Sequence, residues 1–257
     1  MDDFWFRGRH IREFGAVAAF GESMRNGGKV KRGEYALPGG GSVLLGEDEW
    51  QSTTRSVTIT PEDGRIADGP WRRELLAWLQ AGREELVVDN DPDVILLASF
   101  DADGTYEWKS WPAGCLAMSM TLQPLAYSAM ETQRTQHVTA GAETAIGFDL
   151  PGALPAPLRV TLRATGGTIT RAQIGTDSGT LELPNLRLAP GHVLTYDGGQ
   201  FLGDPTALTL DGTVDFSPVQ GGRWARLTCP AGGGALRVML TGGDADVIVS
   251  ARGRWPA

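Results

Sequence analysis

Two neighbouring runs, ALRVMLTG (residues 235–242) and ADVIVSARGRW (residues 245–255), show how the second half of this chain folds. Each is short, rich in apolar residues and followed or preceded by turn-forming glycines, as β-strands are. They belong to a series of such runs that starts near residue 144 and repeats at roughly 8–12 residues, the spacing of a β-sandwich. The other runs are TAIGFDLPG (144–152), PLRVTLRA (157–164), GTLELPNL (179–186), HVLTYDGG (192–199), ALTLDG (207–212) and ARLTCP (225–230).

The first half also favours strands. In RSVTITP (55–61), apolar Val57 and Ile59 alternate with hydroxyl side chains, the pattern of a half-buried strand. In CLAMSMTLQP (115–124), every second side chain from Leu116 to Leu122 is apolar. The remaining predicted strands are FGAVAAF (14–20), ELVVD (85–89), VILLASF (94–100) and TYEWK (105–109).

One helix is predicted, in DGPWRRELLAWLQAG (68–82). Asp68 or Gly69 can cap its start, Pro70 suits the first helical position, and Gly82 suits the end. A single apolar stripe for core packing consists of Trp71, Leu75, Trp78 and Leu79.

The chain length and a change in composition along the sequence predict two domains. It has 257 residues, 41% of them hydrophobic, with 35 Gly and 15 Pro. Such a composition provides a core and many turns. The polar stretch YSAMETQRTQHVTAG (127–141) favours a connector. We therefore predict domains at 1–135 and 136–257.

The charge argues against a nucleic-acid-binding groove. The net charge is −8, and residues 1–136 hold 14 Lys and Arg against 21 Asp and Glu. Tight binding to nucleic acid needs basic surfaces that release counterions. The N-terminal MDDFWFRGRH does not have the pattern of a signal peptide, and no stretch reaches the length of a membrane span. We expect a chain made in the cytoplasm that has no membrane partner.

No motif predicts catalysis or cofactor binding. PGGGS (38–42) lacks the lysine of a phosphate-binding loop, so a tight turn explains it better. DNDPD (89–93) and DADGT (101–105) fit turns better than calcium loops. Cys115 and Cys229 are too few for a disulfide framework or a cysteine-rich zinc site. They can form a bridge only where the two halves of the chain touch.

No motif indicates a catalytic or metal-binding role for the histidines or for the acidic residues either. His10, His137 and His192 stand apart from one another and from the cysteines, and 31 acidic residues single out no catalytic pair. We predict no catalytic, cofactor-binding or metal-binding residue. Aromatic side chains that could contact sugar if exposed are Tyr196, Phe201, Trp224 and Trp255.

The order of these pieces resembles the distal tail protein (Dit) family of long-tailed bacteriophages. In the first domain, the stretches that carry this resemblance are FWFRGRHIREFGAVAAF (4–20), KVKRGEYALPGGGSVLLGEDEW (29–50), RSVTITP (55–61), WRRELLAWLQAG (71–82), ELVVDNDPDVILLASF (85–100) and LAMSMTLQPLAYSA (116–129). In the second domain they are LPAPLRVTLRATGG (154–167) and residues 192–242.

Two turns depart from the family pattern. PGGGS lacks the usual arginine, and PAGGG (230–234) replaces a Pro-Gly-x-Asn turn. The galectin sugar-binding signature is also absent, so the resemblance does not imply sugar binding.

The resemblance implies a mainly β protein with a ring-forming, barrel-like first domain that carries one helix, followed by a galectin-like β-sandwich. It implies a ring, typically a hexamer, at the virion tail tip, between the tail tube protein and the tail-tip protein. Receptor-binding proteins can attach to the second domain, and DNA only passes through the channel. An acidic first domain would suit such a channel, because a negatively charged lumen would not trap DNA.

On this interpretation, Gly40 lies in a close-packed turn of the ring domain, and a β-branched residue there should weaken assembly. Three alternatives stay open: a carbohydrate-binding module for host glycans, a cell-wall hydrolase, and a different β-rich tail or secretion-tube component.

Overall fold

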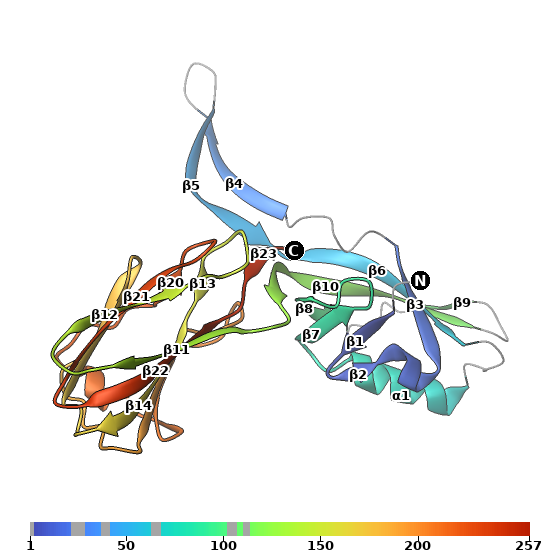
Figure 1. Cartoon of the computed structure of the whole chain (residues 1–257). Coiled ribbons are helices and arrows are strands. Elements are labelled where there is room, and N and C mark those ends of the chain that lie inside the picture. The colour runs from blue at the N-terminus through green and yellow to red at the C-terminus, as the bar shows by residue number, and fades with distance from the viewer. Residues whose placement is uncertain (1–2, 22–28, 37–41, 63–67, 102–106, 110–113) are drawn as a thin grey trace. The chain divides into compact units, whose positions relative to one another are not determined.

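The computed structural model in Figure 1 describes residues 3–21, 29–36, 42–62, 68–101, 107–109 and 114–257, with the side chains of 29–36, 42–49 and 107–109 left out. The chain divides into two compact units, Met1–Ala129 with Pro256–Ala257, and Met130–Trp255. Strands dominate both units, and the described residues contain one α-helix. The prediction of a mainly β fold with one helix is therefore confirmed.

The first unit is built on one curled sheet, whose main path runs β2–β1–β7–β8–β10–β6–β3, with β9 beside β10. Its neighbouring strands are antiparallel. The elements are β1 (Phe4–Phe6), β2 (Arg9–His10), η1 (Ile11–Phe14), β3 (Ala16–Phe20), β4 (Lys29–Ala36), β5 (Ser42–Gln51), β6 (Thr53–Pro61), α1 (Gly69–Leu79), β7 (Glu84–Val88), β8 (Val94–Phe100), β9 (Glu107–Lys109) and β10 (Cys115–Ser128).

Strands β4 and β5 form a separate two-stranded sheet, visible as a long hairpin in Figure 1. Their pairing runs from Lys29 opposite Gln51 to Ala36 opposite Ser42, with a register shift between Lys31 and Gly33. The PGGGS prediction, including Gly40, falls on residues 37–41, outside the described residues. DADGT and the start of TYEWK likewise fall on the undescribed segment 102–106.

Helix α1 forms as the sequence predicts. The Asp68 carboxylate accepts a hydrogen bond from the Trp71 N–H, and the last helical residue, Leu79, precedes Gly82, whose φ is +90°. The four side chains of the predicted stripe are all buried. The helix therefore supplies a large apolar face to a unit that has only one main sheet.

Aromatic rings make up much of the core beneath α1. The Trp78 ring stacks on Phe14 at 4.5 Å and on Phe4 at 5.8 Å between ring centroids. Phe6 and Phe100 meet edge to face at 5.0 Å. The two helix indoles also donate hydrogen bonds, from Trp71 to the Phe14 carbonyl and from Trp78 to the Phe6 carbonyl. These bonds fix the helix on the strands through polar as well as apolar contacts.

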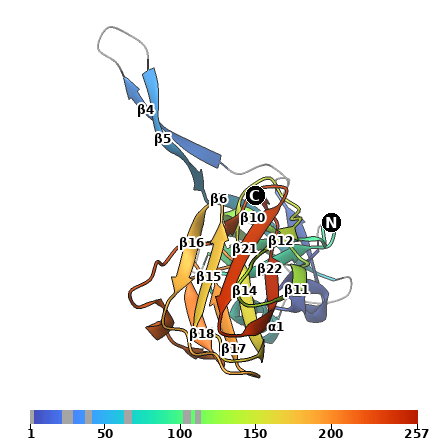
Figure 2. The same cartoon turned by 60° about the vertical axis from the view of Figure 1, so that its left-hand side comes forward.

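The second unit is a β-sandwich of a six-stranded sheet, β11–β22–β14–β17–β18–β19, and a four-stranded sheet, β12–β21–β15–β16, with β13 paired to β20 (Figure 2). Its elements are β11 (Thr132–Val138), β12 (Glu143–Phe148), β13 (Ala156–Pro157), β14 (Arg159–Gly166), β15 (Arg171–Thr176), β16 (Gly179–Leu183), β17 (Val193–Asp197), β18 (Ala207–Leu210), β19 (Thr213–Val214), η2 (Ser217–Val219), β20 (Thr228–Cys229), β21 (Gly234–Thr241) and β22 (Asp244–Ala251). The last strand, β23 (Arg254–Pro256), pairs with β10 and not with a strand of the sandwich.

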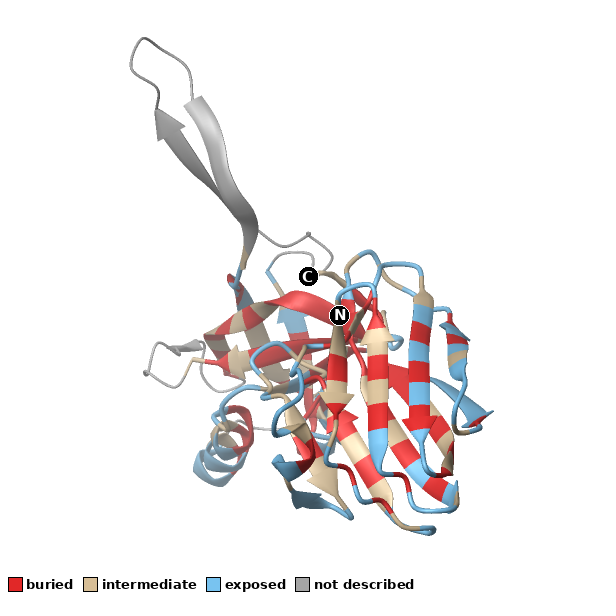
Figure 3. Cartoon of the chain, turned by 90° about the vertical axis from the view of Figure 1, so that its left-hand side faces the viewer, coloured by how far each residue is buried: buried red, intermediate tan, exposed pale blue. Residues whose placement is uncertain are grey.

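Alternating burial along the strands explains how the sandwich closes. In β21 every second side chain from Leu236 to Leu240 is buried, and β14 and β22 alternate in the same way (Figure 3). These side chains form one continuous and mainly aliphatic core. The period-2 pattern puts one face of each sheet inside and the other in water.

The predicted connector is wrong for residues 132–138. This segment is β11, which pairs with β22 from Thr132 opposite Ala251 to Val138 opposite Ala245. Five consecutive side chains of the strand are exposed, because β11 is the edge strand of its sheet. Its backbone ladder rather than side-chain burial holds it in place, so the apolar alternation that marks a strand is missing.

Candidate functional site

All three histidines of the chain pair with an aspartate on a neighbouring segment. The closest nitrogen–oxygen distances are 3.1 Å for His10 and Asp89, 2.9 Å for His137 and Asp246, and 2.6 Å for His192 and Asp211. Each pair joins two parts of one unit. Within the described part of the chain, no three His, Cys, Asp or Glu residues gather as metal ligands would.

Cys229 does not have the surroundings of a reactive thiol. Cys115 and Cys229 are both free, and Cys229 is buried. Burial raises the pKa of the Cys229 thiol, with a smaller contribution from the charge of Asp149. A raised pKa suppresses the thiolate, which is the nucleophilic form.

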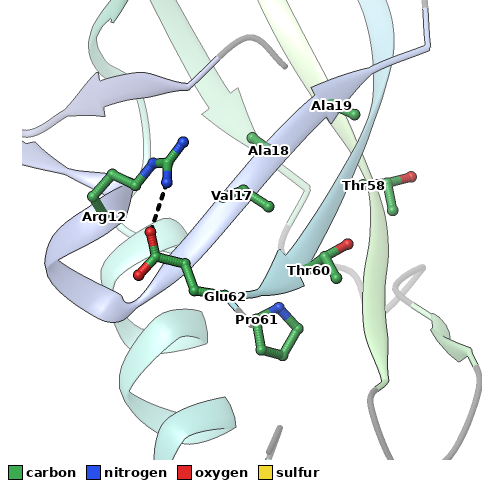
Figure 4. Close-up of a pocket in the computed structure, with 8 residues that line it drawn as sticks. All are labelled: Arg12, Val17, Ala18, Ala19, Thr58, Thr60, Pro61 and Glu62. Atoms are coloured by element: carbon green, nitrogen blue, oxygen red, sulfur yellow. Dashed lines mark hydrogen bonds and ion pairs between the residues drawn. The ribbon is translucent and has the colours of Figure 1, made fainter. Parts of the chain in front are cut away.

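A hollow of the first unit lies over β3 and β6. Figure 4 shows this open groove, about 530 Å³ in volume, with small side chains on its floor and a charged pair at one end. Its lining residues are Arg12, Val17, Ala18, Ala19, Thr58, Thr60, Pro61 and Glu62. The lining provides hydroxyls and methyl groups, together with one ion pair whose charges already satisfy each other.

Arg12 is held by two carboxylates. It donates hydrogen bonds to Glu62, at 2.7 Å, and to Asp3. These bonds, first to Glu62 and then to Asp3, raise the pKa of the guanidinium group. Arg12 is therefore a fixed positive charge at the end of the groove and not a proton donor.

Asp3 connects the two ends of the curled sheet. It precedes β1, yet one of its carboxylate oxygens accepts a hydrogen bond from the Ala18 N–H in β3, at 3.1 Å. Strand β3 lies at the edge of the sheet among the described strands. The backbone hydrogen bonds to the β6 side are made by Gly15 and Gly21, the two residues that flank β3. The backbone N–H of Ala18 therefore points away from β6, and it donates its hydrogen bond to the Asp3 carboxylate. A carboxylate in this position closes the edge against strand addition.

No local sequence pattern indicates this role for Asp3. Its partner is a backbone amide 15 residues away, which becomes a neighbour only because the sheet curls. The aspartate is 6% exposed, which its position near the N-terminus did not suggest.

The four second-domain aromatics differ in exposure. Tyr196 is buried, Phe201 and Trp255 are half-buried, and Trp224 is 37% exposed. The Tyr196 hydroxyl accepts a hydrogen bond from the Leu227 N–H at 2.9 Å and donates one to the Ala225 carbonyl at 3.1 Å. Burial raises the pKa of this hydroxyl. Trp224 is thus the one member of this set with a broadly accessible ring.

A polar cluster surrounds Glu131 in the second unit. One oxygen of Glu131 accepts hydrogen bonds from the Gln200 side-chain amide and the Ser250 hydroxyl. Gln200 also accepts a bond from Arg254 through its carbonyl, at 2.8 Å. Arg159 pairs with Asp197 at 2.7 Å beside this cluster. These hydrogen bonds and the ion pair link residues from distant parts of the unit, which indicates a structural network.

Known structures resemble this chain over its whole length. The crystal structure of the Dit protein of phage SPP1, described as a paradigm of the hub adsorption apparatus in phages that infect Gram-positive bacteria, matches with a TM-score of 0.68 and 12% identity. The match covers 98% of this chain and 99% of that one. A chain of the phage P2 baseplate in its activated conformation with Ca matches with a TM-score of 0.52, 8% identity and 98% coverage of both chains.

The corresponding P2 baseplate structure with Sr matches with a TM-score of 0.53, 8% identity, and coverage of 97% of this chain and 98% of that one. No family model matches the chain, and no curated protein sequence matches it significantly. The structural matches show that the chain has a Dit-like phage tail hub fold, as the sequence resemblance predicted. Among the described residues, no helix is long and apolar enough to cross a membrane.

Proposed function

We propose that this chain is a structural protein of a phage tail tip that assembles as a ring-shaped hub. The match to the SPP1 Dit protein along nearly the full length of both chains carries this proposal. A shared fold alone permits many functions. Here, however, the structural neighbours cover both units, and they belong to tail hubs and baseplates.

The first unit is the part that we assign to ring formation. We identify it with the ring-forming domain predicted at 1–135, and we identify the sandwich with the galectin-like domain predicted at 136–257. The β4–β5 hairpin supports this assignment, because among the described strands β4 and β5 form a two-stranded sheet of their own, and a lone two-stranded hairpin is marginally stable in water. Packing against a neighbouring copy would stabilise it.

The ring would be a hexamer that joins the tail tube protein on one face to the tail-tip protein on the other. DNA would pass through its channel without binding, and the net charge of −8 agrees with that. The sandwich would support receptor-binding proteins. The role is non-enzymatic, and its place is the virion tail after synthesis in the host cytoplasm.

The mass of the purified full chain tests this proposal. We expect light scattering on a sizing column to give about six times the 27.4 kDa chain mass, and negative-stain images to show rings with an open centre. A monomer that stays monomeric when mixed with its tail tube and tail-tip neighbours would contradict the hub function.

A further inference from the structure

Strand β19 leaves an unpaired backbone position at the edge of the sandwich. Asp211 and Gly212, with φ of +48° and +81°, form the two-residue turn that joins β18 to β19, as in a type I′ hairpin. In such a hairpin the flanking residues, Leu210 and Thr213, bond to each other. The next residue, Val214, then points its N–H and carbonyl away from β18. The bond from the Asp215 N–H to the Leu208 carbonyl, at 2.9 Å, fits this alternation.

An aromatic notch follows directly along the chain. Phe216, Val219, Gln220 and Trp224 line a shallow hollow of about 350 Å³. Phe216 is 47% exposed and Val214 is 62% exposed, and the Phe216 and Trp224 rings meet at 66° with centroids 5.4 Å apart. Large apolar side chains that gather on a soluble surface mark interaction sites.

Contacts with neighbouring residues fix the position of the aromatic notch. Trp224 packs edge to face on buried Tyr196 at 5.5 Å, and the Tyr196 hydroxyl bonds to the backbone at Ala225 and Leu227. On the other side, the Asn185 side-chain amide donates to the Gln220 carbonyl. Fixed aromatic rings lose little entropy when a partner binds, which is why they often provide most of the affinity.

We propose that this corner binds an extended segment of a partner polypeptide. The partner backbone pairs with Val214, and one bulky apolar side chain enters the hollow that Phe216, Val219 and Trp224 line. This is strand addition with a side-chain pocket, a common mode of peptide recognition. It goes beyond the hub function and does not depend on it, because ring assembly is assigned to the first unit.

The chemistry of the corner favours a peptide over a sugar. Phe216 and Val219 offer only hydrocarbon surface, and the hydrogen-bonding groups of the notch side chains are the Gln220 amide and the Trp224 indole N–H, whereas sugars need several such groups. The outward N–H and carbonyl of Val214 are spaced to match another backbone. No described strand pairs with this edge, and the structure describes every residue of the second unit.

The test uses the full chain and a panel of fluorescein-labelled pentapeptides, Thr-Val-X-Val-Thr, in which X is Trp, Phe, Leu or Ser. We expect fluorescence anisotropy to show saturable binding of the three apolar peptides and at least about 10-fold weaker binding of the Ser peptide. Hydrogen exchange read by mass spectrometry should show protection confined to residues 208–224. Methyl glucoside and maltose serve as sugar probes.

Three variants separate the parts of the site. Phe216→Ala should weaken binding about 10-fold or more, and Val214→Pro should weaken it by removing the edge N–H. Met239→Ala is the matched control, since Met239 is 36% exposed but lies on the other sheet of the sandwich. Thermal unfolding checks that each variant folds. The proposal would be overturned if the affinity did not depend on the residue X or on Phe216, or if no peptide bound. It would also be overturned if the protection from hydrogen exchange lay outside residues 208–224, or if only the sugars caused protection.

Discussion

The two units of this chain close their cores in different ways. The second unit faces one sheet with another, and its core is almost entirely aliphatic. The first unit has a single curled sheet, so it relies on α1, on stacked aromatic rings and on the Asp3 carboxylate at the seam between β1 and β3. A sandwich distributes closure over many similar contacts, whereas the curled sheet concentrates it in a few residues. Substitutions of those few residues test this difference.

The largest effect is expected for Trp78→Ala. The substitution removes a ring that contacts Phe4, Phe6 and Phe14, together with the hydrogen bond to the Phe6 carbonyl. It should destabilise the first unit by about 3–5 kcal/mol. Denaturant unfolding followed by hydrogen exchange should show lost protection in the first unit only. Leu162→Ala, in the sandwich core, is the matched control, and equal loss of protection in both units upon Trp78→Ala would refute concentrated closure.

Asp3→Ala should come next, at about 2–3 kcal/mol, because it leaves the Ala18 N–H without its charged acceptor and Arg12 without one carboxylate. Asp3→Asn keeps an acceptor oxygen and should recover part of the loss. Glu62→Ala breaks only an exposed pair and should cost less than about 1 kcal/mol. Hydrogen exchange of the Ala18 amide measures the effect directly. Unchanged exchange in Asp3→Ala would contradict the role of Asp3 at the seam between β1 and β3.

A smaller loss, about 1–2 kcal/mol, is expected for Tyr196→Phe in the second unit. The ring remains, but the Leu227 N–H loses its acceptor and the Ala225 carbonyl loses its donor. Thermal unfolding gives the size of this loss, and exchange of the Leu227 amide gives its location. A loss as large as that of Trp78→Ala would mean that the sandwich also depends on single residues.

The smallest effect is expected in the stability of the fold at acid pH. Hydrogen bonds from His192, and then from the Val193 N–H, lower the pKa of Asp211 below its ordinary value of 3.8. A lowered folded-state pKa stabilises the fold above the unfolded pKa, and this contribution is lost as the pH falls through the folded value. Thermal midpoints should therefore differ between wild type and Asp211→Asn at pH 6 and converge toward pH 3. Exposed Glu143→Gln is the control, and a constant difference across this range would contradict the linkage.

Patterns of burial and capping made much of the fold predictable. Helix α1 begins beside Asp68 and buries its four predicted side chains, because capping and amphipathic spacing act within one or two turns. Strand β8 matches the predicted 94–100 run, and the alternation in 115–124 reappears as burial in β10. These features depend on residues close together in the chain.

Strands without an apolar pattern escaped prediction. Thr132–Val138 has mostly exposed side chains, and it becomes a strand only because β22 offers it a backbone edge. The proposed peptide corner was also hidden, since no predicted strand or motif covers Val214 and Phe216. Their exposure follows from the position of β19 at the end of its sheet.

The sequence by itself determined the local elements: where α1 starts, which strands alternate, and that the second half is a series of short strands. It also carried, through the order of these elements, the resemblance that the shared fold confirms. Only the tertiary structure decided that Asp3 closes the sheet at Ala18, that β11 is an edge strand, and that Trp224 stays accessible while Tyr196 is buried. Those facts depend on which distant segments become neighbours, and local spacing carries no information about that.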